Sequence, residues 1–284
     1  MNPVVIIPAR MASTRLPGKP LADIGGVPMI VRVWAQAMRA GIGPVVVAAA
    51  EDEIADAVER AGGHAILTHP GLPSGSDRIF AALKLLDPPG QDGKGRYDTV
   101  INCQGDLPAL DPAQLRAAAA ALPGHDIATL AAPITDEADR ANPAVVKAVV
   151  AWDAQAREGK APPAVAGHQT NQGEGRIGRA LYFSRATVPA GPGDHFYHVG
   201  IYAYTRAALE RFVALPPSPL ERREKLEQLR ALEAGMSIAV ARVDAVPLSV
   251  DTPEDLEYAR RSVGQEKRAS GFPSGRATQK RDES

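Results

Sequence analysis

The sequence has a single cysteine, no long apolar run and almost no net charge. One cysteine cannot build an internal disulfide framework, which favours a reducing compartment, and we expect Cys103 to be a small buried apolar side chain. No stretch approaches the roughly 18 apolar residues that a membrane-spanning helix requires. The net charge of -1 gives no global basic field for nucleic acid, so any anion must bind through a local cluster of cations.

The first residues also lack the basic segment and the apolar segment of a secretory signal. We therefore expect a cytoplasmic protein that engages neither a membrane nor a nucleic acid. With 284 residues, 45% of them hydrophobic and 23% charged, the chain can bury the core of one large domain or two small ones.

Two widespread nucleotide-binding motifs are absent as well: the G-x-x-x-x-G-K-[ST] of a P-loop and the G-x-G-x-x-G of a dinucleotide-binding turn. The chain instead opens with four β-branched residues, 4–7, which predict a short strand buried on both faces, as in a parallel sheet. Pro8 removes a backbone donor and ends this strand. Helical periodicity then starts at Met29.

The loop between that strand and that helix carries three fixed cations, Arg10, Arg15 and Lys19, together with Gly18. A loop in this position lies at the carboxyl edge of the sheet, where open α/β sheets bind ligands. Neighbouring cations repel one another unless an anion lies between them, and arginine and lysine together suit phosphate groups. The loop therefore favours a triphosphate site, and the alternative is an ordinary surface loop with solvated charges.

Strand-like and helix-like patterns alternate as far as residue 103, an order that calls for right-handed crossovers and a parallel sheet. The predicted strands span residues 4–7, 45–50, 64–68, 99–103, 126–133, 144–152, 180–184, 198–204 and 237–243. We therefore expect one α/β domain over residues 1–263, with a Rossmann-like, mostly parallel sheet flanked by helices.

Two segments depart from this pattern. Residues 153–179 hold many glycines and prolines and few large apolar residues, which predicts a flexible insertion in the domain. Residues 264–284 are rich in serine, glycine, lysine, arginine and glutamine without periodicity, which predicts a disordered tail.

Several helix starts are marked by their side chains. Ser76 is the expected cap of the helix that follows it, Asp111 caps a helix whose first residue is proline, and Thr252 opens the last helix with a capping box. A strong helical pattern also begins at Pro219 and ends at Gly235.

Two aspartates follow apolar segments on the same predicted edge as the basic loop. Asp106 comes after the strand 99–103, and Asp251 comes after Val250 and just before the last helix. A carboxylate that faces the basic loop across a phosphate chain suits Mg²⁺, which prefers one or two carboxylates plus substrate phosphates. The alternatives are a turn aspartate for Asp106 and a helix-start residue for Asp251.

Further polar residues are candidates for contacts with the rest of a substrate. Gln104 offers the donor and the acceptor needed to read a base edge. Glu221 and Gln228 lie seven positions apart in one predicted helix and should share a face. Arg185, whose fork can bind a carboxylate bidentately, and His198 lie near the strands after the insertion. For each of them the alternative is a solvated polar residue.

The motifs in chain order are Ile7-Pro8-Ala9-Arg10, Ser13-Thr14-Arg15-Leu16-Pro17-Gly18-Lys19-Pro20-Leu21, Gln104-Gly105-Asp106, Tyr182-Phe183-Ser184-Arg185-Ala186, Gly200-Ile201-Tyr202, Pro217-Ser218-Pro219-Leu220-Glu221, Leu226-Glu227-Gln228-Leu229-Arg230 and Val250-Asp251-Thr252-Pro253-Glu254-Asp255-Leu256. In this order they resemble the 3-deoxy-manno-octulosonate cytidylyltransferase family, the CMP-Kdo synthetases. The likeness runs from the first strand to about residue 260. The first loop alone would indicate only the wider nucleotidyltransferase group.

The resemblance implies a fold like that of the nucleotide-diphospho-sugar transferases. It implies transfer of CMP from CTP to 3-deoxy-D-manno-octulosonate (Kdo), with release of pyrophosphate, for lipopolysaccharide biosynthesis. It also implies a homodimer, and Mg²⁺ bound by Asp106 and Asp251, with catalytic roles for these two residues and for Arg10 and Lys19. The implied nucleotide-binding residues are Pro8, Ala9, Arg10, Lys19, Ser74, Gly75, Ser76 and Gln104, and the implied Kdo-binding residues are Arg15, Arg185, His198, Glu221 and Gln228.

The chain departs from the family pattern at three places. Leu107 stands where the family usually has glutamate, Ser76-Asp77 replaces the usual Thr-Glu, and the insertion at 153–179 is longer than expected. The first two bear on the nucleotide pocket and the third on dimer geometry. Two other functions stay open: a cytidylyltransferase for another 2-keto acid sugar, such as sialic acid or 8-amino-Kdo, and a non-catalytic nucleotide-binding regulator.

Overall fold

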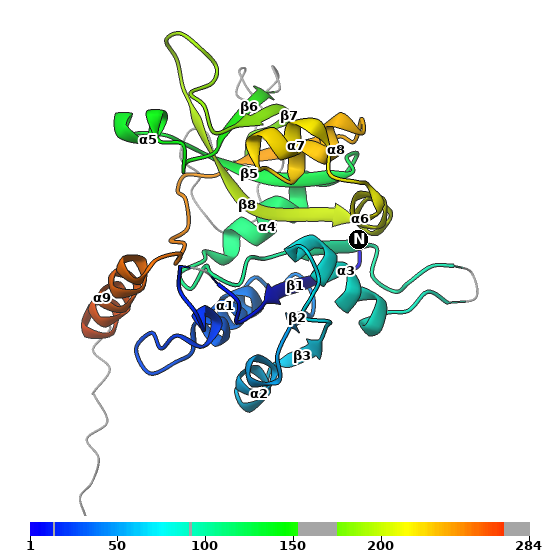
Figure 1. Cartoon of the computed structure of the whole chain (residues 1–284), viewed down its shortest axis with the longest axis vertical. Helices are drawn as coiled ribbons and strands as arrows, with labels where there is room; N and C mark the ends of the chain where they lie inside the picture. Colours follow the sequence, from blue (N-terminus) through cyan, green and yellow to red (C-terminus); the bar gives the residue numbers. More distant parts are fainter. Residues whose placement is uncertain (14, 91–92, 153–174, 270–284) are drawn as a thin grey trace, which may run out of the picture.

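A computed structural model describes residues 1–13, 15–90, 93–152 and 175–269 (Figure 1). The strands are β1 (Pro3–Ala9), β2 (Val45–Ala49), β3 (His64–Leu67), β4 (Thr99–Asn102), β5 (Ile127–Pro133), β6 (Lys147–Trp152), β7 (Ile177–Ser184), β8 (Phe196–Thr205) and β9 (Ile238–Arg242). The helices are η1 (Lys19–Leu21), α1 (Met29–Arg39), α2 (Asp52–Arg60), α3 (Gly75–Leu86), α4 (Pro112–Ala121), α5 (Glu137–Ala141), α6 (Arg206–Ala214), α7 (Pro219–Glu224), α8 (Gln228–Glu233) and α9 (Pro253–Ala269). These strands form one sheet in the order β3-β2-β1-β4-β8-β5-β9-β7-β6.

The first half of the sheet is parallel, as predicted. β1 pairs in parallel with β2 and β4, and β2 pairs in parallel with β3. The side chains of residues 4–7 are fully buried, because β1 is a central strand with helices on both faces. Crossover helices connect these strands, so the carboxyl ends of β1, β2 and β4 lie at one edge of the sheet.

The second half of the sheet is mixed, which corrects the expectation of a mostly parallel sheet. β8 runs antiparallel to β4 and β5, and β7 runs antiparallel to β9 and β6. A parallel pair needs a crossover connection, usually a helix. Between β5 and β8 the only helix in the described part of the chain is the short α5, and β6, β7 and β8 therefore pair antiparallel.

Helices cover both faces of the sheet. α1 and α4 bury Ile30 and Leu115 against one face, and α3 and α6 bury Leu83 and Phe212 against the other. Cys103 is fully buried in the first of these cores, as predicted. Figure 1 shows the parallel half with α1, α2 and α3 below, and the mixed half with α7 and α8 above.

Most predicted helix starts are confirmed, with one shift. Ser74, not Ser76, caps α3: Ser74 Oγ accepts from the Asp77 backbone N–H at 3.1 Å. Ser76 consequently lies inside the first turn of the helix. Asp111 caps α4, and Thr252 Oγ1 accepts a backbone N–H at the start of α9.

The long helix predicted from Pro219 to Gly235 is two helices, α7 and α8. Lys225 ends α7 in the left-handed region, with φ 57°. The leucine periodicity runs across the break, so the sequence pattern did not reveal it. The expectation that Glu221 and Gln228 share a face of one helix is therefore wrong.

Residues 153–174 and 270–284, which make up most of the predicted insertion and tail, lie outside the described residues. The end of the predicted insertion belongs to β7, which starts at Ile177. α9 continues to Ala269, beyond the predicted start of the tail at residue 264, because it has a capped start and contains many glutamate, lysine and arginine residues. Among the described residues, no helix is long and apolar enough to cross a membrane.

Candidate active site

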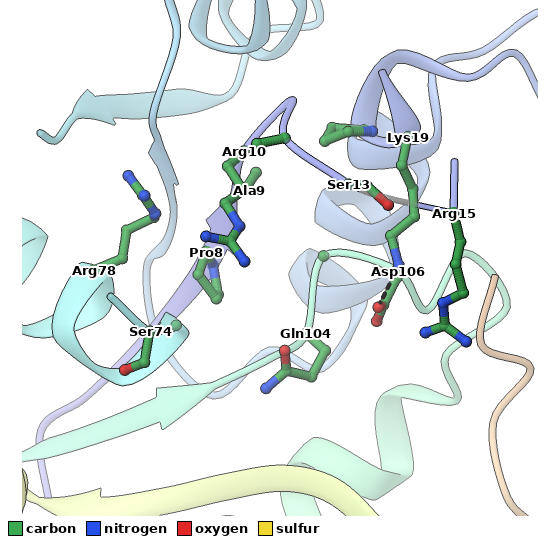
Figure 2. Close-up of a pocket in the computed structure, with 14 residues that line it drawn as sticks. Pro8, Ala9, Arg10, Ser13, Arg15, Lys19, Ser74, Arg78, Gln104 and Asp106 are labelled. Atoms are coloured by element: carbon green, nitrogen blue, oxygen red, sulfur yellow. Dashed lines mark hydrogen bonds and ion pairs between the residues drawn. The ribbon is translucent and has the colours of Figure 1, made fainter. Parts of the chain in front are cut away.

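A cavity of about 400 Å³ lies at the carboxyl edge of the parallel half of the sheet (Figure 2). The loop after β1, the first turn of α3 and the loop after β4 form its wall. The lining residues are Pro8, Ala9, Arg10, Ala12, Ser13, Arg15, Lys19, Pro20, Ser74, Gly75, Arg78, Gln104, Gly105 and Asp106. Four of these side chains are cationic and one is a carboxylate, a balance that suits a polyphosphate.

Two glycines give this wall its shape. Gly18 has φ 70° and precedes η1, so it turns the chain at the point where Lys19 enters the site. Gly105 lies against the end of β1, where an added Cβ would be only 2.7 Å from the Pro8 carbonyl oxygen. Glycine at position 105 therefore allows the loops after β1 and β4 to approach closely.

Lys19 lies between the two carboxylates that the sequence predicted as metal ligands. Its Nζ donates to Asp106 Oδ2 at 2.7 Å and to Asp251 Oδ1 at 3.0 Å, and Arg15 Nη2 lies 3.3 Å from the same Asp251 oxygen. Burial alone would lower the pKa of Lys19, but the two carboxylates outweigh it and raise that pKa above its ordinary value. The Val250 N–H donates to the Asp106 carbonyl at 3.0 Å, which fixes the two acidic loops side by side.

Arg78 lines the opposite part of the cavity from Lys19 and Arg15, as Figure 2 shows. Arg78 is only 2% exposed, and its guanidinium donates to Thr68 Oγ1 at 2.7 Å and to two backbone carbonyls of the turn before α3. Burial lowers the pKa of Arg78; nearby Arg10 lowers it further, and a neighbouring carboxylate opposes the effect. Arg78 is thus a rigidly held cation at the cavity wall.

The predicted nucleotide-binding residues mostly gather here. Gln104 lies in the loop after β4, between the two groups of cations in Figure 2, and Ser74 and Gly75 line the cavity from α3. Ser76 does not line it, because its Oγ donates to Glu227 Oε2 at 2.9 Å.

Two of the predicted Kdo-binding residues meet in the mixed half of the sheet. His198 is 7% exposed; its Nε2 lies 3.1 Å from Thr129 Oγ1, and its Nδ1 lies 3.5 Å from Gln228 Nε2. Burial lowers the pKa of His198 to about 3. The imidazole is therefore neutral near pH 7, and His198 is not a cation for a sugar carboxylate.

The other two residues predicted there already have protein partners. Arg185 Nε donates to the Glu224 carbonyl at 3.0 Å, and its backbone N–H donates to the Glu224 carboxylate. Glu221 accepts two bonds from Arg230, at 2.6 and 2.8 Å, and one from the Ser218 N–H. Burial would raise the pKa of Glu221, but these bonds lower it overall. Neither residue lines the cavity.

Two residues near the site were missed by the sequence interpretation. Arg78 lies in the first turn of α3, at the carboxyl edge of the sheet. An arginine so close to a helix start at that edge could have indicated an anion-binding residue. Glu51 accepts the Met11 N–H at 2.9 Å and ties the basic loop to the start of α2, but its position resembles any acidic helix start. Glu227, a candidate beside Glu221 and Gln228 on the predicted late helix, lies instead at the break between α7 and α8.

Comparison with known proteins finds that the chain is similar to cytidylyltransferases. The profile of the Cytidylyltransferase family matches residues 4–238. The 3-deoxy-manno-octulosonate cytidylyltransferase of Parvibaculum lavamentivorans is 61% identical over 264 residues, which cover 92% of this chain and 93% of that protein. The protein of the same name from Rhodospirillum rubrum is 60% identical over 265 residues, which cover 92% of this chain and 96% of that protein.

Two solved structures resemble the fold of this chain. The structure of CMP:2-keto-3-deoxy-manno-octonic acid synthetase complexed with CTP superposes with a TM-score of 0.78 at 36% identity, covering 94% of this chain and all of that one. A 4-diphosphocytidyl-2C-methyl-D-erythritol synthase from Anaerococcus prevotii, at 14% identity and a TM-score of 0.56, shares the fold over 93% of this chain and 98% of that one. With identities of 60% and above over nine-tenths of its length, the chain belongs to the 3-deoxy-manno-octulosonate cytidylyltransferase family.

Proposed function

We propose that this protein transfers CMP from CTP to Kdo and releases pyrophosphate. The observation that carries the proposal is the cavity at the sheet edge, where cations from the loop after β1 and from α3 surround one space and two carboxylates meet at Lys19. The relatives named as Kdo cytidylyltransferases and the related structure complexed with CTP support the same substrates. The product would feed lipopolysaccharide synthesis.

The cavity supports a division of roles among its residues. Arg10, Lys19 and Arg78 offer donors from opposite sides to the triphosphate, and their charge favours pyrophosphate as it leaves. We assign the cytosine and ribose to Gln104 and the Ser74-Gly75 turn, because these residues line the cavity and Gln104 has both a donor and an acceptor for the base edge.

Asp106 and Asp251 fit Mg²⁺. Two hard oxygen donors from different loops meet at a position that already stabilises the positive charge of Lys19, and substrate phosphates would supply further oxygens. Bound there, Mg²⁺ would neutralise charge that develops on the reacting phosphate and lower the pKa of the attacking hydroxyl.

The reaction is an in-line displacement at phosphorus. The anomeric hydroxyl oxygen of Kdo forms a bond to the α-phosphorus, the bond to the bridging oxygen breaks, and pyrophosphate leaves with the electron pair while the hydroxyl proton passes to solvent. The protein contributes by holding the two substrates in line and by providing fixed positive charge at the phosphates.

The Kdo side is assigned to Arg15 and to residues of the mixed half. Neutral His198 and its partner Gln228 offer hydrogen bonds to hydroxyls, and Arg185 is the cation for the Kdo carboxylate. Glu221 accepts two hydrogen bonds from Arg230 and would support Kdo binding indirectly, by holding α7 and α8 together.

We also propose that the protein is a cytoplasmic homodimer, because its CTP substrate is cytoplasmic and the family resemblance implies a dimer. Light scattering of the pure protein tests the dimer.

Pyrophosphate release tests the function directly. Four nucleoside triphosphates should be combined with Kdo, 8-amino-Kdo and sialic acid in the presence of Mg²⁺. We expect release only when CTP and Kdo are both present. Preference for sialic acid or 8-amino-Kdo would overturn the choice of acceptor, and CTP binding without turnover of any acceptor would support a regulator instead.

A further inference from the structure

Ser76 connects two parts of the protein that are distant in the sequence. It lies in the first turn of α3, directly after the cavity-lining Ser74 and Gly75, and it is 3% exposed. Its Oγ donates to Glu227 Oε2 at 2.9 Å. The hydroxyl therefore points away from the nucleotide cavity, toward the break between α7 and α8.

Glu227 has one oxygen fixed and one without a partner. Oε2 accepts from Ser76, whereas Oε1 is buried and has no hydrogen-bond partner among the described residues. Arg230 Nη2 is 3.9 Å from Oε1, too far for a hydrogen bond, and it donates to Glu221 at 2.6 Å instead. A buried carboxylate oxygen without a donor is costly, so it marks a place where a donor is expected.

The residues around Glu227 belong to the side of the protein assigned to the acceptor sugar. The next residue, Gln228, contacts His198, and His198 contacts Thr129 on β5. A sugar acid presents several hydroxyl donors, which are the groups that an unpaired carboxylate oxygen accepts.

We propose that Ser76 is a positioning residue for the acceptor. By holding Oε2 of Glu227, it fixes the carboxylate so that Oε1 accepts a hydroxyl of the sugar, and it ties the acceptor side to the helix start that lines the nucleotide cavity. This inference rests on the proposed function. Its physical requirement is a hydroxyl at position 76, which threonine also provides and alanine does not.

The test compares Ser76→Ala with Ser76→Thr. Removal of a hydrogen bond to a charged group should raise the KM for Kdo about tenfold or more in Ser76→Ala. The KM for CTP and the calorimetric affinity for CTP should change by less than about twofold, because Ser76 does not line the cavity. Ser76→Thr should restore most of the affinity for Kdo.

Ser237→Ala is a matched control. Ser237 Oγ also donates to a carboxylate, Asp126 Oδ2, at 2.9 Å, but it precedes β9 at the amino edge of the sheet. Loss of this bond should lower the melting temperature without changing either KM. The melting temperature of Ser76→Ala, measured beside it, separates loss of stability from loss of acceptor binding.

A second measurement tests whether Ser76 acts through Glu227. The double variant Ser76→Ala with Glu227→Gln should lose no more affinity for Kdo than Glu227→Gln alone, because the two changes break one connection. Equal losses for Kdo and CTP, identical behaviour of the alanine and threonine variants, or additive losses in the double variant would overturn the role of Ser76. If the wild type releases no pyrophosphate from CTP and Kdo, the proposed function fails and this inference fails with it.

Discussion

At the scale of single residues, the site is organised by the charge balance around Lys19. Its side chain is 15% exposed, and its ammonium lies between Asp106, which lines the cavity, and Asp251, which does not line it. Replacing any one of these three residues is costly, because it leaves a partly desolvated charge without its partner. Two predictions follow from this balance.

The first concerns the two carboxylates. Asp106→Asn and Asp251→Asn should each leave the fold intact and lower turnover by orders of magnitude, because a neutral amide does not replace a carboxylate toward Mg²⁺. Pyrophosphate release measured over a range of Mg²⁺ concentrations checks this. Asp111→Asn is the control, since asparagine also caps a helix and Asp111 does not line the cavity. Near-normal turnover of either site variant would remove that residue from the proposed metal site.

The second concerns the pH dependence of stability. Lys19→Met should lower the free energy of unfolding at pH 7, because Asp106 and Asp251 lose their shared cation. The pKa of Lys19 is raised in the folded protein above its ordinary value of 10.5. Its contribution is therefore fully present below that value and is lost as pH rises through the folded-state pKa. Urea unfolding of both proteins from pH 7 to above pH 11 should show a difference that persists to about pH 10. A difference that vanished below pH 9 would contradict the assigned partners.

At the scale of elements, the break between α7 and α8 places the residues that the proposed function assigns to the acceptor. Lys225 adopts φ 57°, a conformation that costs a residue with a side chain roughly 1–2 kcal/mol. The chain accepts this cost at the point that turns Glu227 toward Ser76 and Gln228 toward His198. Strained backbone is frequent near functional sites, where the surrounding structure enforces it.

Lys225→Gly should preserve the break and leave turnover unchanged while raising stability. Glycine adopts positive φ without strain, although its greater freedom in the unfolded chain offsets part of the gain. We expect a net increase of up to about 1 kcal/mol in the free energy of unfolding, measured with urea. Lys225→Ala retains the strain and serves as the comparison. A less stable glycine variant would show that the Lys225 side chain, rather than the backbone, supports the turn.

The elements differ in how well the sequence predicts them. The parallel half is predictable because each of its strands is a short, mostly apolar run that is followed by a helix. The break at Lys225 is not, because lysine carries no local signal for positive φ and the leucines on either side keep a helical spacing. The cap of α3 was placed two residues late, because Ser74 and Ser76 have the same chemistry and only the phase of the helix distinguishes them.

At the scale of the whole molecule, the proposed function divides the two substrates between the two halves of the sheet. The parallel half provides the cavity proposed for CTP, and the mixed half carries His198, Arg185 and Gln228. The rule that open α/β sheets bind ligands at their carboxyl edge predicted correctly that Lys19 and Asp106 share one edge, although the two side chains are in direct contact rather than separated by a phosphate chain. It gave no guidance for the mixed half, where antiparallel pairing and side-chain contacts over long sequence separations decide which residues meet.

This division predicts that changes in the mixed half affect one substrate only. Arg185 is braced by the carbonyls of Glu224 and Pro143 and lies outside the cavity. Arg185→Ala should raise the KM for Kdo at least tenfold, through loss of a charge-assisted bond to its carboxylate. The calorimetric affinity for CTP should stay within about twofold, because no residue of the nucleotide wall changes.

Arg179→Ala is a suitable control. Arg179 is an exposed arginine on β7, the strand that ends directly before Arg185. It should change neither affinity, because an exposed charge away from the substrates contributes little. If Arg185→Ala weakened CTP and Kdo equally, the two halves would not bind the substrates separately. If the dependence on Kdo were unchanged, the sugar carboxylate would have to bind elsewhere, and Arg15 would replace Arg185 as its cation, because buried His198 is neutral.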